Sequence, residues 1–406
     1  MEPSLTAYDP ALRVSVIVVN WNGRAYLERC LQSLAAQTLV AHEVVVVDNG
    51  STDGSVEWLC DGATVDKREA ALRDGPRGGG LLSANGELSC AIKPASVRPA
   101  EPPSIGGVSK GAPARNSTLP VDTVRVVALS SNVGYGAALN AGMRAAHGQY
   151  LLALNNDTEL APGCLETLVT AADRQPNSGL FAPKILSADP PHRIDTVGHL
   201  LYADGLSRGR GRLEDDRGQY DREEEILLPS GCAVLLRRAM LADVGVFDED
   251  LFAYCEDTDL GLRAQLAGWR CTAVPGAVIY HAYSASTAHY SPLKAFLVER
   301  NRAWVAAKCL PLPLLVLSPV FTLLRLAAQG YGALTHRGAA GRFAAEQSRG
   351  ALLAVLVRAL VAATAGLPRA LRKRRVVQAR RRVGLADTLQ WVTHHGMGLR
   401  EIALKD

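Results

Sequence analysis

The sequence predicts an α/β fold in which a sheet is flanked by helices, followed by a helical C-terminal appendage. Two observations lead to this fold class. Short β-branched runs alternate with stretches in which apolar residues recur at helical spacing, the pattern of βαβ units with right-handed crossovers. The chain also has 406 residues, 48% of them hydrophobic, which suits one large domain with a real core and an additional segment.

The first half of the chain supplies the alternating elements in order. The run from Val14 to Asn20 suits a strand that is buried on both faces of a parallel sheet. Apolar residues then recur at Leu27, Leu31 and Leu34, which predicts a helix over 24–37. The same reasoning predicts further strands at 43–48, 123–129 and 150–155, and further helices at 51–59 and 134–147.

A long segment, residues 61–120, interrupts this alternation. It is rich in Gly, Pro, Ala, Ser and Arg, and it shows no sustained apolar period. A structureless loop of this length would ordinarily count against the assigned elements, but the flanking strands are regular. We therefore expect a surface insertion that is mostly disordered, either simply tolerated or serving a regulatory or partner-binding role.

The pattern becomes less regular beyond Gly179. A polar stretch over 208–225 favours a loop, and the apolar run 233–236 follows it. The sequence then predicts helices at 237–244 and 257–267, a strand at 270–281 and a helix at 292–309. Residues 1–309 are therefore expected to form the main domain, and residues 310–406 a basic, partly apolar helical tail.

Charge and cysteine usage exclude several classes of protein. The net charge of +4 is concentrated in the tail, where twelve Lys or Arg face the single acid Glu346 between Arg337 and Arg382. This basic run is not interleaved with aromatic residues, so a nucleic-acid partner is not expected. The eight cysteines lie singly, which excludes a zinc site or a disulfide framework by spacing. Residues 1–13 lack the pattern of a secretory signal, so a cytoplasmic location is expected.

Polar clusters follow the predicted strands, where open α/β sheets collect their ligand-binding groups. Asp48 ends the second strand and can accept a hydrogen bond from the N3–H of uracil or thymine. Ser51 or Thr52, just after it, could equally be an ordinary helix N-cap. The loop that contains Asn132 and Gly134 precedes a helix and can meet phosphate or ribose, although its glycines could serve a tight turn alone.

A second cluster, Asn155-Asn156-Asp157, has no packing reason to follow a buried strand. A carboxylate there can hold Mg2+ or Mn2+, hard cations that prefer oxygen ligands and bridge diphosphate oxygens. A single carboxylate provides too few protein ligands for a metal ion, so a second protein ligand is expected. His281, at the end of the 270–281 strand, is the candidate, although a lone histidine at a strand end is also a common surface residue.

Three acids fall within four residues at Glu256-Asp257-Thr258-Asp259, where a helix is predicted to start. The helix dipole favours acids at this position, but a cap requires only one or two of them. One of these carboxylates can act as a general base toward an acceptor hydroxyl.

In this order the motifs resemble those of the family 2 glycosyltransferases, inverting enzymes of the GT-A fold, and within them the rhamnosyltransferase-like branch. The resemblance covers about residues 14–309 without the insertion, and it implies the mixed, Rossmann-like sheet of nucleotide-diphospho-sugar transferases. The matching segments are Val18–Asn22, Val47–Gly54, Asn132–Gly134, Leu154–Thr158, Ser230–Gly231, Glu256–Leu260 and His281.

The resemblance implies roles for these positions. Asp48 with Asn49 would bind the nucleobase, Asn132 and Gly134 would lie near the ribose or diphosphate, and Asp157 with His281 would bind the metal. Asp257 would be the catalytic base beside Glu256, and Ser230 and Gly231 would lie under the donor sugar or the acceptor. Asn155 and Asn156 complete the donor site; Asn155 departs from many relatives, which carry an Asp there, but the rhamnosyltransferase-like members share this form.

The implied reaction is a single displacement with inversion, in which a nucleotide-diphosphate sugar is the donor and a lipid-linked or polysaccharide glycan is the acceptor. The branch makes dTDP-rhamnose the first candidate donor, with UDP-sugars and GDP-mannose as alternatives. A sugar nucleotidyltransferase would need a Gly-rich, basic phosphate loop after the first strand, which Asn20–Gly23 does not supply. A non-catalytic scaffold would be expected to have lost the acids that this chain keeps.

The tail suggests contact with a membrane. The apolar stretch 310–324 carries Pro311, Pro313 and Pro319, so an uninterrupted span of about 20 residues is not expected. A second apolar stretch, 351–365, precedes clustered Lys and Arg. We expect helices that lie on the cytoplasmic face of the inner membrane, with a soluble helical tail and a true span as alternatives.

Overall fold

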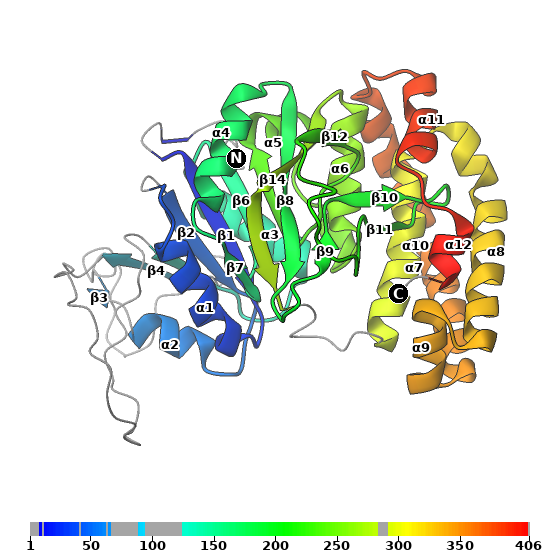
Figure 1. Ribbon diagram of the computed structural model, residues 1–406, viewed down its shortest axis with the longest axis horizontal. Coiled ribbons are helices and arrows are strands. Elements are labelled where there is room, and N and C mark those ends of the chain that lie inside the picture. Colours follow the sequence, from blue (N-terminus) through cyan, green and yellow to red (C-terminus); the bar gives the residue numbers. More distant parts are fainter. Residues whose placement is uncertain are drawn as a thin grey trace.

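A 12-stranded mixed sheet runs through the computed structural model, which describes residues 8–9, 12–39, 42–61, 64–65, 88–93, 124–282 and 291–404 (Figure 1). The strand order is β12-β14-β8-β13-β6-β1-β2-β5-β4-β3, with β7 and β9 paired to β14 and β8. This architecture, with helices on both faces, confirms the predicted α/β class and its mixed sheet. Most of the 61–120 insertion, and with it the expected disorder, lies outside the described residues.

The parallel half of the sheet is built on β1 (Val14–Asn20). It pairs in parallel with β2 (His42–Asp48) and β6 (Tyr150–Asn155), and β2 pairs in parallel with β5 (Val124–Ala128). The register sets Asn20 beside Asp48 and Val19 beside Asn155. The polar strand ends therefore meet at one edge of the sheet, as parallel strands require.

The other half of the sheet brings two more segments to this edge. Strand β13 (Ala233–Arg237) runs antiparallel to β6, so its first residue lies at the carboxyl end of β6. Strand β14 (Arg270–His281) runs parallel to β8 (Ser178–Ser187) and ends against β7 (Thr158–Leu160), with His281 opposite Thr158. The short strands β9 (Ile194–Thr196) and β12 (Glu224–Ile226) complete this half, and β10 (His199–Leu201) pairs with β11 (Ser207–Gly209) in a separate antiparallel sheet.

Helices cover both faces of the sheet because side chains alternate along β1. Val16 and Val18 belong to one apolar core, with α1 (Arg24–Ala35) and α4 (Cys164–Arg174). Ile17 and Val19 belong to the opposite core, which contains residues of the following helices: α3 (Tyr135–Ala145), α5 (Arg238–Val244) and α6 (Glu256–Leu266). Burial on both faces explains why β1 is apolar at nearly every position.

One prediction in the first half of the chain needs correction, and one short strand pair was not predicted. The helix predicted over 51–59 begins only at Ser55, as α2 (Ser55–Asp61), because Gly50 and Gly54 adopt left-handed φ values of 76° and 80°. Neither Ser51 nor Thr52 caps it; the Asp53 carboxylate accepts a 3.1 Å hydrogen bond from the Ser55 N–H instead. The segment 61–120 also contains a short antiparallel pair, β3 (Thr64–Val65) and β4 (Leu88–Lys93), which extends the sheet beyond β5.

The C-terminal helices gather at one side of the sheet domain, with α8 at the outer edge (Figure 1). They are α7 (Pro292–Cys309), α8 (Leu312–Thr335), α9 (Gly338–Gln347), α10 (Arg349–Ala379), α11 (Leu385–His394) and α12 (Leu399–Leu404). A third apolar core joins them to the sheet domain, with Leu262 and Leu266 of α6 against Val305, Leu314 and Trp391.

The expectation that prolines interrupt the first apolar stretch of the tail is wrong. Helix α8 runs for 24 residues through Pro319. Pro311 and Pro313 lie at its start, where the helix needs no N–H from them, so only Pro319 removes an internal hydrogen bond. Leu312–Thr335 and Gly350–Ala379 are each long and apolar enough to cross a membrane by length and composition.

Candidate active site

Asp48 holds the turn between β2 and α2. Its Oδ2 accepts a 2.9 Å hydrogen bond from the Asn20 side chain, and its Oδ1 accepts a 2.8 Å bond from the backbone N–H of Ser51. The residue is 1% exposed. A carboxylate has about four lone-pair positions, so these two bonds leave acceptor capacity for a further N–H donor. Asp48 is thus fixed in place by the fold at the edge where β1 and β2 end.

Asn49 and Asn132 join β2 to the loop after β5. The Asn49 amide donates to Asn132 Oδ1 at 3.1 Å, and the same oxygen accepts a 2.9 Å bond from the Gly134 N–H. Gly134 has a φ of 95°, and a Cβ there would lie 2.4 Å from the carbonyl oxygen of Phe252. Glycine is therefore required by both the backbone conformation and the close approach of another segment.

Asn155 and Asn156 stand at the end of β6, between the two halves of the sheet. The Asn156 amide donates to Asn20 Oδ1 at 2.6 Å, and the Asn155 N–H donates to the Cys232 carbonyl at 2.9 Å. Asn20 therefore bridges Asn156 and Asp48. Sequence reasoning gave Asn20 no separate role, although it carries the same signal as Asp48, a polar side chain at the end of a buried strand.

Asp157 and His281 face each other at the other side of the edge. Asp157 Oδ1 lies 3.4 Å from His281 Nε2, and Asp195 Oδ2 lies 2.7 Å from His281 Nδ1. Burial alone would lower the pKa of His281, but Cys232, Asp157 and Asp195 raise it well above its ordinary value. The structure thus brings the predicted metal pair together, and the largely buried carboxylate of Asp195 orients the His281 imidazole.

This pair fits a divalent cation on chemical grounds. A histidine ligand commonly donates its other N–H to a carboxylate, which fixes the tautomer and leaves the remaining nitrogen for the metal. Asp195 occupies that position. Within the residues that the structure describes, no group of three or more His, Cys, Asp or Glu side chains could hold a metal ion. A cation at Asp157 and His281 would therefore need further oxygen ligands, which diphosphate and water supply.

Glu256 and Asp257 begin α6 in different surroundings. Asp257 is partly exposed, and its Oδ2 accepts a 2.8 Å bond from the backbone N–H of Gly231 while its Oδ1 accepts a 2.6 Å bond from that of Thr258. Glu256 is buried, and its Oε2 has no hydrogen-bond partner among the described residues. Burial and the neighbouring Asp257 raise the pKa of Glu256 to about 8. Near neutral pH, Glu256 is thus largely protonated, and Asp257 is the carboxylate that N–H donors hold in place.

Ser230 and Gly231 lie in the segment that leads into β13. The Gly231 carbonyl accepts a 2.8 Å hydrogen bond from the Tyr135 hydroxyl, and Ser230 Oγ accepts a 3.3 Å bond from the Cys232 N–H. A Cβ on Gly231 would lie 3.2 Å from Asp257 Oδ2. The small residue at this position lets the chain approach the carboxylate closely.

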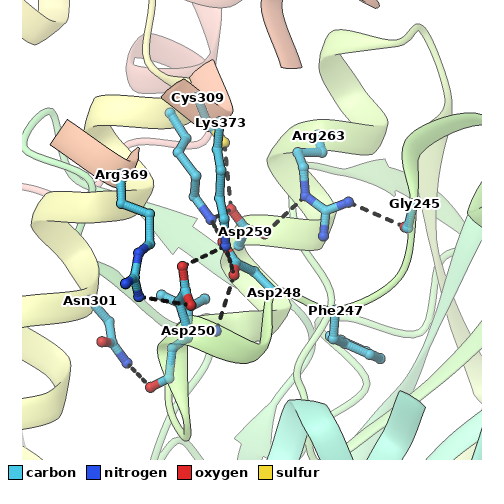
Figure 2. A network of polar contacts seen from close by, with 12 residues as sticks. Gly245, Phe247, Asp248, Asp250, Asp259, Arg263, Asn301, Cys309, Arg369 and Lys373 are labelled. Atoms are coloured by element: carbon cyan, nitrogen blue, oxygen red, sulfur yellow. Dashed lines mark hydrogen bonds and ion pairs between the residues drawn. The ribbon is translucent and has the colours of Figure 1, made fainter. Parts of the chain in front are cut away.

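Asp259, the third acid of the cluster, points away from this edge. It is fully buried and forms ion pairs with Arg263 at 2.9 Å and Lys308 at 2.6 Å. Figure 2 shows it within a network that links α6 to the C-terminal helices. Asp259 is therefore held in structural ion pairs, and Glu256 and Asp257 remain the candidates for catalysis.

Two residues near the site were not found from the sequence. Asp195 lies on β9, and His199 on β10 has its Nδ1 3.6 Å from Asp257 Oδ2. Both come from short strands within a stretch that had no clear period. Only the pairing of β9 with β8 and the packing of β10 bring them to the edge.

Comparisons with known proteins agree with this fold. The family model for glycosyl transferase family 2 matches residues 15–84 and 120–245. The N-acetylglucosaminyl-diphospho-decaprenol L-rhamnosyltransferase of Mycobacterium tuberculosis (strain ATCC 25618 / H37Rv) is 29% identical over 319 residues, covering 71% of this chain and 85% of that protein. The O-antigen biosynthesis protein RfbC of Myxococcus xanthus is 30% identical over 159 residues, 37% of this chain and 12% of that protein.

A solved structure supports the fold. The crystal structure of GalNAc-T7 with UDP, GalNAc and Mn2+ superposes with a TM-score of 0.50 at 17% identity. The match covers 74% of this chain and 48% of that one, so this chain spans about half of the larger structure. At this identity the likeness bears on the fold alone. The family model and the sequence relatives show that the chain is a glycosyltransferase similar to glycosyl transferase family 2, and the superposed structure shows that it has the GT-A fold.

Proposed function

We propose that the protein is an inverting, metal-dependent glycosyltransferase that moves a hexose from a nucleotide-diphosphate sugar to a lipid-linked or polysaccharide acceptor in cell-envelope glycan synthesis. One observation carries the proposal. The carboxylates of Asp48, Asp157 and Asp257 come from three distant segments, and the fold brings them to the same edge of the sheet. Such convergence of polar groups at the carboxyl ends of strands is typical of ligand sites in α/β folds.

Each group has a proposed role on the donor side. Asp48, with Asn49 beside it, accepts a hydrogen bond from the nucleobase, and Asn132 with Gly134 contacts the ribose or diphosphate. Asn155 and Asn156 complete the donor site. Asp157 and His281 hold Mg2+ or Mn2+. When bound, this cation supplies Lewis-acid stabilisation of the departing diphosphate.

On the acceptor side, Asp257 is the proposed base. It accepts the proton of the acceptor hydroxyl as the oxygen attacks the anomeric carbon, and the nucleoside diphosphate leaves from the opposite face with inversion. The backbone N–H of Gly231, 2.8 Å from Asp257 Oδ2, keeps the carboxylate oriented. Glu256, neutral near pH 7 because its pKa is about 8, avoids placing a second negative charge beside the base. General-base catalysis of this kind contributes about 10²- to 10⁴-fold in rate.

Rhamnose is the first candidate among donor sugars, because a relative that matches 71% of this chain is named as a rhamnosyltransferase. The name of that relative also indicates a lipid diphosphate acceptor. We therefore propose dTDP-rhamnose as donor, with UDP-sugars and GDP-mannose as the alternatives.

The tail is the proposed site of membrane contact. Arg325 is the only charged residue of α8, and it is fully buried, with its Nε 2.7 Å from Asp204 Oδ2. The outward face of α8 is apolar and exposed at Leu312, Val316, Leu317, Val320, Leu323, Leu324, Tyr331 and Leu334. An apolar face with nearby Lys and Arg suits a helix that lies on an anionic membrane surface.

Attachment of α8 to the protein favours a peripheral location on the cytoplasmic face of the inner membrane over a crossing. Arg325 is tied to Asp204, between β10 and β11, and to Glu299 on α7. A spanning α8 would have to give up these buried pairs. We accordingly propose that residues 1–309 form the catalytic domain and that residues 310–406 form the membrane-contacting tail.

Nucleotide binding gives the first test. A ligand that binds only the folded state raises apparent stability, by about 2.7 kcal/mol at a hundred times its Kd. We expect dTDP or UDP with Mn2+ to raise the melting temperature, and Asp157→Asn to remove the metal-dependent part. The exposed Asp189→Asn is the matched control. If neither dTDP, UDP nor GDP stabilises the protein with Mn2+, a scaffold role replaces the proposed one.

Vesicle sedimentation tests the membrane contact. The protein should sediment with vesicles that contain anionic lipid, and Val316→Asp or Leu323→Asp on α8 should reduce the bound fraction. Leu385→Asp on α11 is the control, because Leu385 is an exposed apolar residue outside α8 and α10. Equal binding by the α8 variants and the wild type would exclude α8 as the contact face.

A further inference from the structure

The backbone that leads into the two catalytic candidates is held in an unfavourable conformation. Phe252, Tyr254 and Cys255 have φ values of 65°, 67° and 67°, and none of them is glycine. Residues with a Cβ rarely adopt this left-handed region. Such a conformation persists only where surrounding groups impose it. Because Glu256 and Asp257 follow directly, whatever imposes it also sets the start of α6.

Asn301 of α7 supplies the restraint. Its side chain is 0% exposed, and its amide nitrogen lies 2.8 Å from each of three carbonyl oxygens, those of Leu251, Ala253 and Tyr254. Arg300 Nε donates to Asn301 Oδ1 at 2.9 Å, which directs the nitrogen end of the amide toward the carbonyls. Figure 2 shows Asn301 reaching this segment from the α7 side.

The same segment also touches the donor side of the site. The carbonyl oxygen of Phe252 accepts a 2.6 Å hydrogen bond from the backbone N–H of Tyr135, next to Gly134. The segment 251–255 therefore lies between the loop that contains Asn132 and Gly134 and the acids at the start of α6. A shift of this segment would change the distance between donor and base.

Arg300 Nη2, also on α7, donates to the Leu251 carbonyl at 2.9 Å, so Asn301 is the side-chain donor chiefly for the carbonyls of Ala253 and Tyr254. The contacts that come from α10 are weaker restraints. Lys373 Nζ lies 2.7 Å from Asp250 Oδ2, and Arg369 Nη1 lies 3.2 Å from Asp250 Oδ1. The Lys373 and Arg369 side chains are 40% and 63% exposed. Exposed ion pairs contribute little, whereas buried carbonyl groups left without donors are costly. The buried amide of Asn301 is thus the main restraint.

The geometry assigns Asn301 the role of a positioning residue: its buried amide fixes the 251–255 backbone and thereby places Asp257 relative to the donor loop. This assignment rests on the proposed role of Asp257 as the base. It makes the first helix after the sheet, α7, part of the catalytic scaffold.

Two variants separate positioning from general stability. Asn301→Ala removes the donors, and Asn301→Asp keeps the shape but presents oxygen to three carbonyls. Arg374→Ala is the matched control, because Arg374 Nη1 also donates to three carbonyls, those of Ala307, Lys308 and Leu310, without touching segment 251–255. The measurements are hydrogen exchange of the amides of residues 251–258, stabilisation by dTDP with Mn2+, and kcat and KM for transfer from dTDP-rhamnose.

Both Asn301 variants should exchange the 251–258 amides at least about tenfold faster than the wild type. Their kcat should fall about 10²-fold, the usual cost of a misplaced group, while KM for the donor and the effect of dTDP change little. Arg374→Ala should lower the melting temperature without either effect.

Two results would overturn the assignment: unchanged exchange at 251–258, or a kcat loss in the Asn301 variants no larger than in Arg374→Ala. Failure of the proposed function is distinguishable, because it would show as a wild-type protein that transfers no sugar from dTDP-rhamnose, a UDP-sugar or GDP-mannose. The exchange measurement needs no substrate and reports on Asn301 in either case.

Discussion

The buried ion cluster that joins α8 to the rest of the molecule should be strongly stabilising only while it is complete. The Arg325 guanidinium lies 2.7 Å from Asp204 and 2.7 to 2.8 Å from Glu299. Arg302 contacts the same two acids at 3.2 and 3.1 Å. Two cations therefore balance two carboxylates, and Arg325→Met would leave one buried negative charge without compensation.

Removal of one partner from a buried ion pair costs about 3–5 kcal/mol, and we expect Arg325→Met to lose this much unfolding free energy. Asp204→Asn in the same chain would restore neutrality. Asp204 Oδ1 accepts a 3.1 Å hydrogen bond from the Leu206 N–H, which an Asn oxygen can also accept. Because replacing both partners by neutral groups of similar shape is close to neutral, the double variant should regain most of the loss.

The loss should also depend on pH. Burial opposes the charged form of Glu299, but the Arg325 and Arg302 guanidinia lower its pKa below the ordinary value. A lowered carboxylate pKa stabilises the fold above the pKa of the unfolded chain, and this contribution disappears as the pH falls through the folded value. The difference between wild type and Arg325→Met should therefore be largest near neutral pH and shrink in acid.

Urea unfolding followed by circular dichroism measures these differences. The control is Arg193→Met, which breaks the exposed pair of Arg193 and Asp215, 3.1 Å apart with side chains 52% and 54% exposed. This pair should contribute less than about 1 kcal/mol. If Arg325→Met loses no more than Arg193→Met, or if the double variant is less stable than Arg325→Met, the charge-balance argument fails.

Three further predictions concern the site. Asp257→Asn should reduce transfer by about 10²- to 10⁴-fold while dTDP with Mn2+ still stabilises the protein, and near-normal kcat would reject Asp257 as the base. Asp195→Asn should weaken Mn2+ binding about 10- to 100-fold, measured by electron paramagnetic resonance against Asp189→Asn, because Asp195 orients His281. The stability of Glu256→Gln relative to wild type should rise between about pH 5 and about pH 8. In this range Glu256 loses its proton in the unfolded wild-type chain but keeps it in the folded one, where its pKa is about 8, so the wild type loses stability as the pH rises. A pH-independent difference in melting temperature between Glu256→Gln and wild type would contradict the raised pKa.

Much of the sheet was predictable because its signals are local. The strand over 150–155, the strand over 270–281 and the helix over 292–309 were predicted with the bounds that the structure has. β-branched and apolar runs of strand length leave few alternatives when helical stretches separate them. Polar residues at their ends then identified the edge where the fold brings Asp48, Asp157 and Asp257 together.

The predicted bounds of helices were wrong where the effect of a single proline or glycine depends on its surroundings. Pro319 lies inside α8 although proline usually ends a helix, and two left-handed glycines delay the start of α2. The β3 and β4 pair was missed for a related reason: Leu88–Lys93 forms a strand beside β5, but the surrounding segment gives it no periodic neighbours.

The fold class, the order of the motifs and the chemistry of the side chains at the strand ends could be predicted, because they depend on residues close together in the chain. The groups that contact these side chains could not be predicted, because they come from distant parts of the chain. Asp195 meets His281 across 86 residues, and Asn301 reaches the carbonyl of Tyr254 across 47. Such contacts depend on strand register and helix packing, which bury one side chain against a backbone far away in sequence and leave no local pattern.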